Sequence, residues 1–133
     1  MASPTPMIQR VSNQDASLGK VFYRSTTVPT SWTAAHTVPT SPQGARDLVT
    51  WATFTATDAT AYTLQMRVVP LTGATAEIGQ AQLAADGEQW RPMEPGVALP
   101  LEPGDQLQII GSGAGTVNVN VYIAGVQHRP GAV

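Results

Sequence analysis

A strict alternation of apolar and polar residues marks the segment 117–123, where every second position is apolar. The apolar positions are Val117, Val119, Val121 and Ile123, and between them lie Asn118, Asn120 and Tyr122. A period of two residues predicts a strand with one buried face and one face toward water or a partner. Upstream, Pro103-Gly104-Asp105 predicts a turn and 106–110 predicts another strand. Because the glycine-rich stretch 111–115 joins the two strands, we expect 101–126 to form a β-hairpin.

Shorter patterns of the same kind predict strands at 21–23, 32–38, 48–56, 62–69 and 78–83. The turn signals between them, Thr57-Asp58-Ala59-Thr60 and Asp86-Gly87, are typical of hairpins. Closely spaced short strands without a helical period favour an all-β chain. We predict a single antiparallel β-sandwich or jelly-roll-like domain.

The segment 48–56 has apolar side chains on both faces, Leu48 and Phe54 one way and Val49 and Trp51 the other. This pattern is typical of a strand at the centre of a sheet or one that faces a subunit contact. The candidates for contacts between subunits are Leu48, Trp51, Asn118, Asn120 and Tyr122. The expected core consists of Trp51, Phe54, Leu64, Met66, Val68, Leu107, Ile109, Val117, Val119, Val121 and Ile123.

The first 19 residues show neither the two-residue period of a strand nor the period of a helix, and Pro4 and Pro6 disfavour regular structure there. We expect an extended N-terminal arm at 1–19, the sandwich domain at 20–128 and a C-terminal tail at 129–133. The apolar residues with which the arm would bind a neighbouring protein are Met7, Ile8 and Val11. The alternative is a disordered terminus that binds nothing.

Composition narrows the classes of protein to consider. A chain of 133 residues suits one domain with its own core, and the absence of cysteine excludes disulfides and thiolate metal sites. A net charge of −2 with scattered basic residues argues against a nucleic-acid partner. No apolar stretch is long enough for a membrane helix, and we expect no signal peptide in the first ten residues, which lack a basic and an apolar region. The low charged fraction, 12%, indicates either genomic composition or a surface covered by other subunits.

The sequence has few groups of residues that could form a catalytic or metal site. His36 and His128 lie far apart with no ligand partner at close spacing, and the pattern predicts no metal site, no cofactor and no catalytic residue. The acidic residues Asp86, Glu88, Glu94, Glu102 and Asp105 would have to converge in space to form a glycosidase or Ca²⁺ site. We expect turn roles for them instead. The aromatic residues Trp32, Trp51, Trp90 and Tyr122 could form a sugar-stacking face, although core packing is the expected role of Trp51.

A glycine-rich loop and a valine-rich strand follow the motif Leu101-Glu102-Pro103-Gly104-Asp105-Gln106-Leu107. This arrangement resembles the end of small β-sandwich virion structural proteins of tailed bacteriophages. The resemblance extends over 22–127, and its short motif also occurs in other jelly rolls. It implies a non-enzymatic capsid decoration (cement) protein that binds the outside of the major capsid shell. The alternative within this class is a tail or head-fibre component.

The resemblance also implies the protein's partners and location. They would be the chain itself, as a homotrimer, and the major capsid protein or other virion proteins, with neither nucleic acid nor membrane. The protein would be located in the virion, assembled in the host cytoplasm. From a different class, a carbohydrate-binding β-sandwich module stays open, and this alternative predicts a monomer with an exposed aromatic face.

Overall fold

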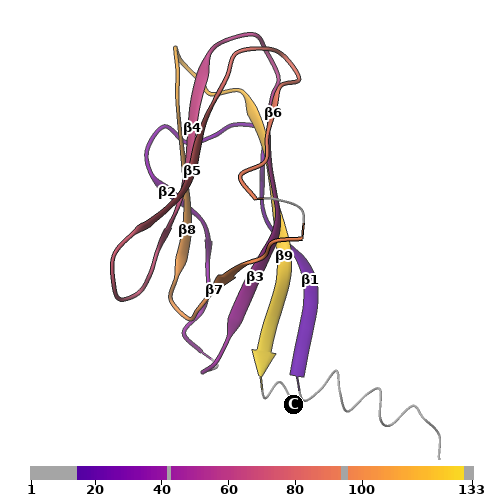
Figure 1. Ribbon diagram of the computed structural model, residues 1–133, viewed down its shortest axis with the longest axis vertical. Helices are drawn as coiled ribbons and strands as arrows, with labels where there is room; N and C mark the ends of the chain where they lie inside the picture. The colour runs from indigo at the N-terminus through magenta and orange to yellow at the C-terminus, as the bar shows by residue number, and fades with distance from the viewer. Residues whose placement is uncertain (1–14, 42, 94–95, 131–133) are drawn as a thin grey trace, which may run out of the picture.

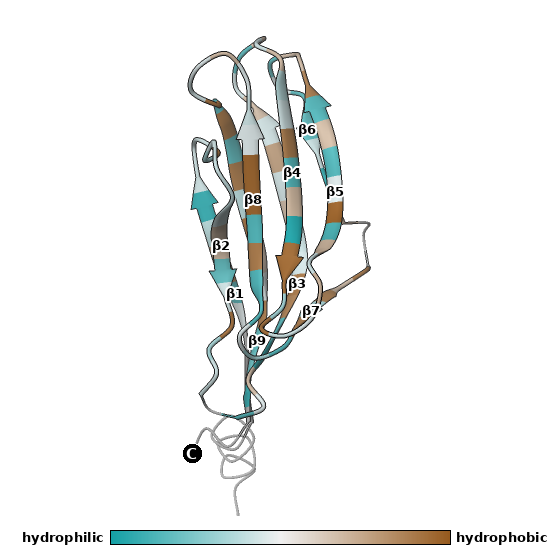
Figure 2. Ribbon diagram, turned by 90° about the vertical axis from the view of Figure 1, so that its left-hand side faces the viewer, coloured by the Kyte–Doolittle hydropathy of each residue, from teal (hydrophilic) through white to brown (hydrophobic). Residues whose placement is uncertain are grey.

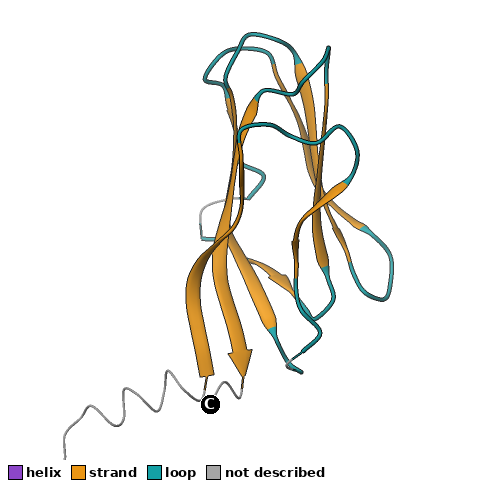
Figure 3. Ribbon diagram, turned by 180° about the vertical axis from the view of Figure 1, so that it is seen from behind, coloured by secondary structure: helices purple, strands orange, loops and turns teal. Residues whose placement is uncertain are grey.

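The computed structural model describes residues 15–41, 43–93 and 96–130, which form nine strands and no helix (Figure 3). The strands are β1 Asp15–Ser25, β2 Thr33–Thr37, β3 Arg46–Ala56, β4 Tyr62–Val69, β5 Ala76–Leu83, β6 Gln89–Trp90, β7 Leu99–Leu101, β8 Gln106–Ser112 and β9 Val119–Pro130. Since the described residues contain no helix, none of them forms a helix that could span a membrane.

Two antiparallel sheets face each other (Figure 1). The first sheet has the order β1-β9-β3, and two short strands, β6 and β7, pair with opposite ends of β3 on its far side. The second sheet has the order β2-β8-β4-β5. If β6 and β7 are taken as two pieces of one strand, each sheet has four strands, which is the double-sheet jelly-roll architecture. The predicted β-sandwich is therefore confirmed.

The core lies between the sheets, where the inward faces of the strands meet. Alternating hydropathy is visible along β4 and β8 (Figure 2), and their inward residues Leu64, Met66, Leu107 and Ile109 are fully buried. The alternation in the last strand is also confirmed, because Val119, Val121 and Ile123 are buried while Asn120 and Tyr122 are exposed. All of the expected core residues are buried except Val68, which is half-buried, and Trp51, which is exposed.

The hairpin expected at 101–126 does not form. β8 belongs to the second sheet and β9 to the first, so the glycine-rich loop between them crosses the sandwich. The turns between β3 and β4 and between β5 and β6 cross it as well. Among the described strands, β4 and β5 are the only consecutive pair that hydrogen-bond to each other. Turn residues fix local backbone angles, as at Gly87 with φ of 84°, but they do not choose the next partner strand.

The first and last strands are longer than the pattern suggested. β1 begins at Asp15, inside the range expected for the arm, and β9 continues to Pro130, inside the range expected for the tail. The two strands pair along their length, from Asp15 opposite Pro130 to Ser25 opposite Val121. They extend past the second sheet at one end of the molecule (Figure 1). Backbone pairing, which needs no apolar period, forms this extension. The proposed arm residues Met7, Ile8 and Val11 lie outside the described residues.

Two β-bulges flank β9 at nearly the same level. The register of β3 shifts between Val49 and Trp51, and that of β1 shifts between Val21 and Tyr23. A Cβ on Gly125 would lie 1.8 Å from the carbonyl oxygen of Leu48, so only glycine fits between the bulged strands. After the extra residue in β3, the positions that would have pointed inward point outward, and the reverse. Trp51 consequently points outward with 41% of its surface exposed, and its predicted core role is wrong in this chain.

Candidate interaction site

The outer face of the first sheet carries a row of apolar side chains. Val21 pairs with Ala124, which pairs with Trp51, and one step further Val126 pairs with Leu48. We call these five residues the outer stripe. Val21 and Trp51 are exposed by 46% and 41%, and the other three are half-buried. The bulge in β3 creates this stripe, because without it Leu48 and Trp51 would point to opposite faces.

A short chain of hydrogen-bonded polar side chains lies beside Trp51 on the surface. The guanidinium of Arg91 lies 4.7 Å from the centre of the indole ring, at a distance typical of a cation–π contact. Arg91 Nε donates a hydrogen bond to Gln89 Oε1 at 3.1 Å, and Gln89 Nε2 donates to Thr55 Oγ1 at 3.1 Å. One face of the exposed indole therefore has a cation beside it.

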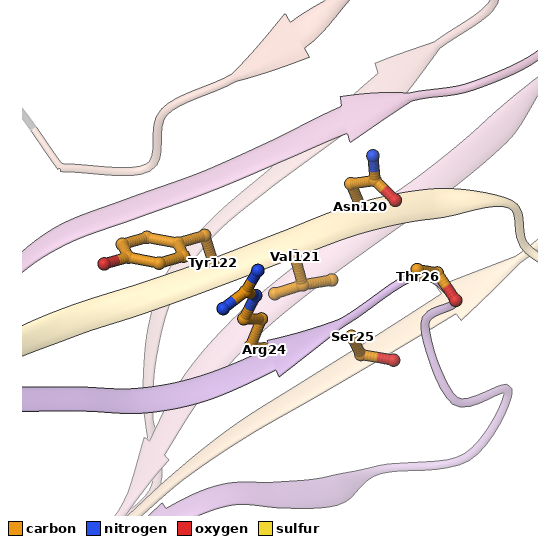
Figure 4. Close-up of a pocket in the computed structure, with 6 residues that line it drawn as sticks. All are labelled: Arg24, Ser25, Thr26, Asn120, Val121 and Tyr122. Atoms are coloured by element: carbon orange, nitrogen blue, oxygen red, sulfur yellow. The ribbon is translucent and has the colours of Figure 1, made fainter.

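Beside the outer stripe, the structure has a groove of about 540 Å³ between β1 and β9 (Figure 4). Its lining residues are Arg24, Ser25, Thr26, Asn120, Val121 and Tyr122. Arg24 lies directly opposite Tyr122 in the strand pairing, and 38% of Tyr122 is exposed. Val121 points into the core, so the groove lies over the backbone of a central strand.

The structure divides the five predicted contact residues. Leu48 and Trp51 belong to the outer stripe, while Asn120 and Tyr122 line the groove. Asn118 has a different environment, because its Nδ2 donates to Asp58 Oδ2 at 3.0 Å and ties the β3–β4 loop to the start of β9. The same carboxylate oxygen accepts from Tyr62 Oη at 2.9 Å. The hydrogen bond from Asn118, followed by those from the Thr60 amide and the Tyr62 hydroxyl, holds the pKa of Asp58 below its ordinary value of 3.8.

A buried ionic cluster connects the sheets, and the sequence analysis did not identify it. Asp47 on β3 is fully buried, and its carboxylate bonds to His36 Nε2 on β2 and to Arg129 on β9. Arg129 Nη1 donates to Asp47 Oδ1 at 2.6 Å. The ring of Phe22 stacks on His36 with centroids 4.2 Å apart. The signal that could have revealed the cluster is Asp47 itself, a carboxylate two residues before the buried Val49 on the same inward face.

The other chemical candidates have structural roles. Glu88 Oε1 accepts from the amides of Ala84 and Ala85, and the Asp105 carboxylate accepts from those of Leu71 and Glu102. These are the turn roles expected of such residues. In the described part of the chain, no three residues among His, Asp and Glu gather as metal ligands would.

The four aromatic residues do not form one face. Trp51 and Tyr122 share the outer face of the first sheet. Trp90 packs against the buried Phe54 with centroids 5.0 Å apart, and Trp32 lies under the guanidinium of Arg67, 3.9 Å from its ring centre. Only two of the four aromatic rings are therefore exposed on a common surface.

No protein-family model matches the chain, and no curated protein matches it either. Solved structures do match at low identity. The structure of infectious bursal disease virus Gx strain has a TM-score of 0.47 at 11% identity, covering 90% of this chain and 34% of that chain. The Gt strain structure has a TM-score of 0.43 at 12% identity, covering 90% and 33%.

A third structure, the crystal structure of the T13 viral particle of the same virus, has a TM-score of 0.45 at 11% identity, covering 90% and 33%. The present chain thus spans about a third of the length of the solved chains that it matches.

Proposed function

We propose that the chain is a non-enzymatic structural protein of a tailed-bacteriophage virion, and specifically a capsid decoration protein that binds the outside of the major capsid shell. The observation that carries this proposal is the outer stripe, an apolar row on the outer face of a jelly-roll sheet. Exposed apolar rows of this kind are typical of surfaces that other proteins cover. The motif at 101–107 resembles that of tailed-phage virion proteins, and this resemblance favours other virion proteins as the partners.

The outer stripe is the proposed contact between copies of the chain, as a homotrimer, or between the chain and the shell. Leu48, Val126, Trp51, Ala124 and Val21 form a contiguous apolar surface on three adjacent strands. Covering it removes apolar area from water, and Arg91 beside Trp51 supplies a polar rim. The low charged fraction of the chain agrees with an extensively covered surface.

The segment before Asp15 is the second proposed contact. Met7, Ile8 and Val11 would bind a neighbouring virion protein, and backbone pairing with a sheet edge of that neighbour would add to their contribution. Each contact would be weak, and repetition around a symmetric shell would supply avidity.

Antibody labelling of purified phage particles from the source that encodes the chain tests the function. Label on the heads supports the decoration role, whereas label confined to tails or fibres supports the alternative of a tail or head-fibre component. Particles without any label would overturn both.

Sedimentation of the free chain tests the outer stripe. The wild-type chain should sediment as a trimer at micromolar concentration, and Trp51→Glu should shift it to monomer, because the substitution puts a carboxylate into the contact. Leu71→Glu is the matched control. It replaces another exposed apolar residue, 64% exposed, which lies in the β4–β5 loop and is not part of the outer stripe. Equal effects of both variants would contradict the assigned surface.

A further inference from the structure

We propose that the groove between β1 and β9 binds a saccharide that carries a carboxylate, such as a hexuronic or sialic acid. The inference goes beyond the structural role proposed above and does not depend on it. It rests on three properties of the groove: the cation of Arg24, which pairs with no described residue, the exposed ring of Tyr122 beside it, and two polar side chains, Asn120 and Thr26, that bond to no described residue.

Arg24 supplies the site for the carboxylate. Its side chain is exposed at the groove and makes no hydrogen bond or ion pair with any residue that the structure describes. Its planar guanidinium can donate two parallel hydrogen bonds to one carboxylate. The described side chains of β1 and β9 include no Asp or Glu that could compete with a ligand for Arg24. The carboxylate of Asp47 on β3 is buried on the opposite face of the sheet.

Tyr122 and Asn120 supply the site for the sugar ring. The tyrosine ring lies opposite Arg24 and is partly open to solvent, so the apolar C–H face of a pyranose could pack on it (Figure 4). The amide of Asn120 and the hydroxyl of Thr26 have no hydrogen-bond partner within the described ranges. Together they offer donors and acceptors for sugar hydroxyls. Ser25 is already engaged, since its Oγ donates to the carbonyl of Thr27.

The size of the groove favours a small ligand over a protein. Its volume of about 540 Å³ is within the range of about 300–1,000 Å³ of small-molecule sites. A stable protein contact instead buries about 800 Å² on each partner, far more than six lining residues present. β9 lies between β1 and β3 in the sheet, so the backbone of Asn120, Val121 and Tyr122 is held on both sides, and β1 is held by β9. A preformed site of this kind loses little entropy when a ligand binds.

Titration of the ¹⁵N-labelled full chain, followed by amide chemical shifts, tests the proposal. Glucuronic acid or N-acetylneuraminic acid should shift the amides of residues 24–26 and 120–122, and glucose should bind about tenfold more weakly or worse. Arg24→Gln should weaken binding of the acid about tenfold or more, since it removes a charge-assisted pair. Tyr122→Ala should weaken it too, and Tyr122→Leu, which keeps apolar bulk without the ring, should do the same in a folded chain.

Lys20→Gln is the matched control, because it removes one positive charge from an exposed residue of the same strand outside the groove. This variant should bind the acid like wild type. Binding of acetate as tight as that of glucuronic acid would overturn the proposal in favour of a simple anion site. A preference for a poly-glutamate peptide would overturn it in favour of a protein partner, and the absence of shifts with both acidic sugars would overturn it altogether.

Discussion

The guanidinium of Arg129 donates a hydrogen bond of 2.6 Å to the carboxylate of Asp47, and this contact joins β9 to β3 where the carboxylate is fully buried. Asp47 also bonds to His36 on the other sheet, so one side chain connects three strands across the sandwich. A carboxylate can remain in this environment only because charged and hydrogen-bonding partners surround it.

Removal of the cation should therefore be costly. Arg129→Met leaves Asp47 buried with only His36 as its side-chain partner, and we expect the free energy of unfolding to fall by about 3–5 kcal/mol. Urea denaturation measures this change. Arg46→Gln, which removes the same charge from an exposed pair with Glu102 at 3.8 Å, should cost about 1 kcal/mol or less. Similar losses in the two variants would show that the buried cluster does not contribute in this way.

Gly125→Ala should prevent the native register of β9. The added Cβ would meet the carbonyl oxygen of Leu48, a backbone atom that cannot move without separating β3 from β9. Gly19→Ala is the control, because no atom lies within 4 Å of its Cβ position. Circular dichroism and thermal melting should show a folded Gly19→Ala chain and a strongly destabilised Gly125→Ala chain. A cooperative melt near the wild-type temperature for Gly125→Ala would refute the pair of bulges.

Asn118→Ala should raise the pKa of Asp58 toward 3.8, because the hydrogen bond from Asn118 is the largest cause of its lowering. The folded-state pKa lies below the unfolded value, so Asp58 stabilises the fold fully above pH 3.8 and this stability is lost as pH falls through the folded-state pKa. The variant should thus lose less stability in acid than wild type does. Carboxyl ¹³C titration and melting at several pH values measure both effects. An unchanged Asp58 pKa in the variant would contradict the assignment.

Val119→Asp should unfold the domain. Val119 is fully buried between the sheets, and an unpaired carboxylate there costs several kcal/mol. Asn120→Asp changes the next residue, whose side chain is exposed, and should leave the melting temperature close to that of wild type. Melting curves of the two variants test the alternation of the last strand. A soluble Val119→Asp chain that melts cooperatively would mean that the register is wrong.

The segment before β1 should be removable without loss of the fold. Deletion of residues 2–14 spares the paired strand from Asp15 onward, so the free chain should keep its melting temperature while it loses occupancy on particles. Deletion of residues 2–18 removes in addition the pairing partners of 127–130, and it should lower the melting temperature. If the shorter deletion leaves particle occupancy unchanged, Met7, Ile8 and Val11 have no role in binding.

The sequence by itself determined which faces of the regular strands are buried. In β4 and β9 apolar residues recur at every second position, and Leu64, Met66, Val119 and Val121 are buried on the inward face that this period predicts. The turn at Pro103-Gly104-Asp105 was equally local, since Gly104 adopts a φ of 84° and the amide of Asp105 donates to the carbonyl of Glu102. Such features depend only on neighbouring residues.

The tertiary structure alone decided which strands pair and where the register slips. The loop from β8 to β9 has the residues of a hairpin, yet each strand buries its apolar face against the opposite sheet, and the connection crosses the sandwich. Likewise, Trp51 is exposed because a bulge beside Gly125 inserts one residue into β3, and Asp47 is buried because Arg129 lies beside it. These outcomes depend on contacts between residues far apart in the chain, which a local period of apolar positions does not encode.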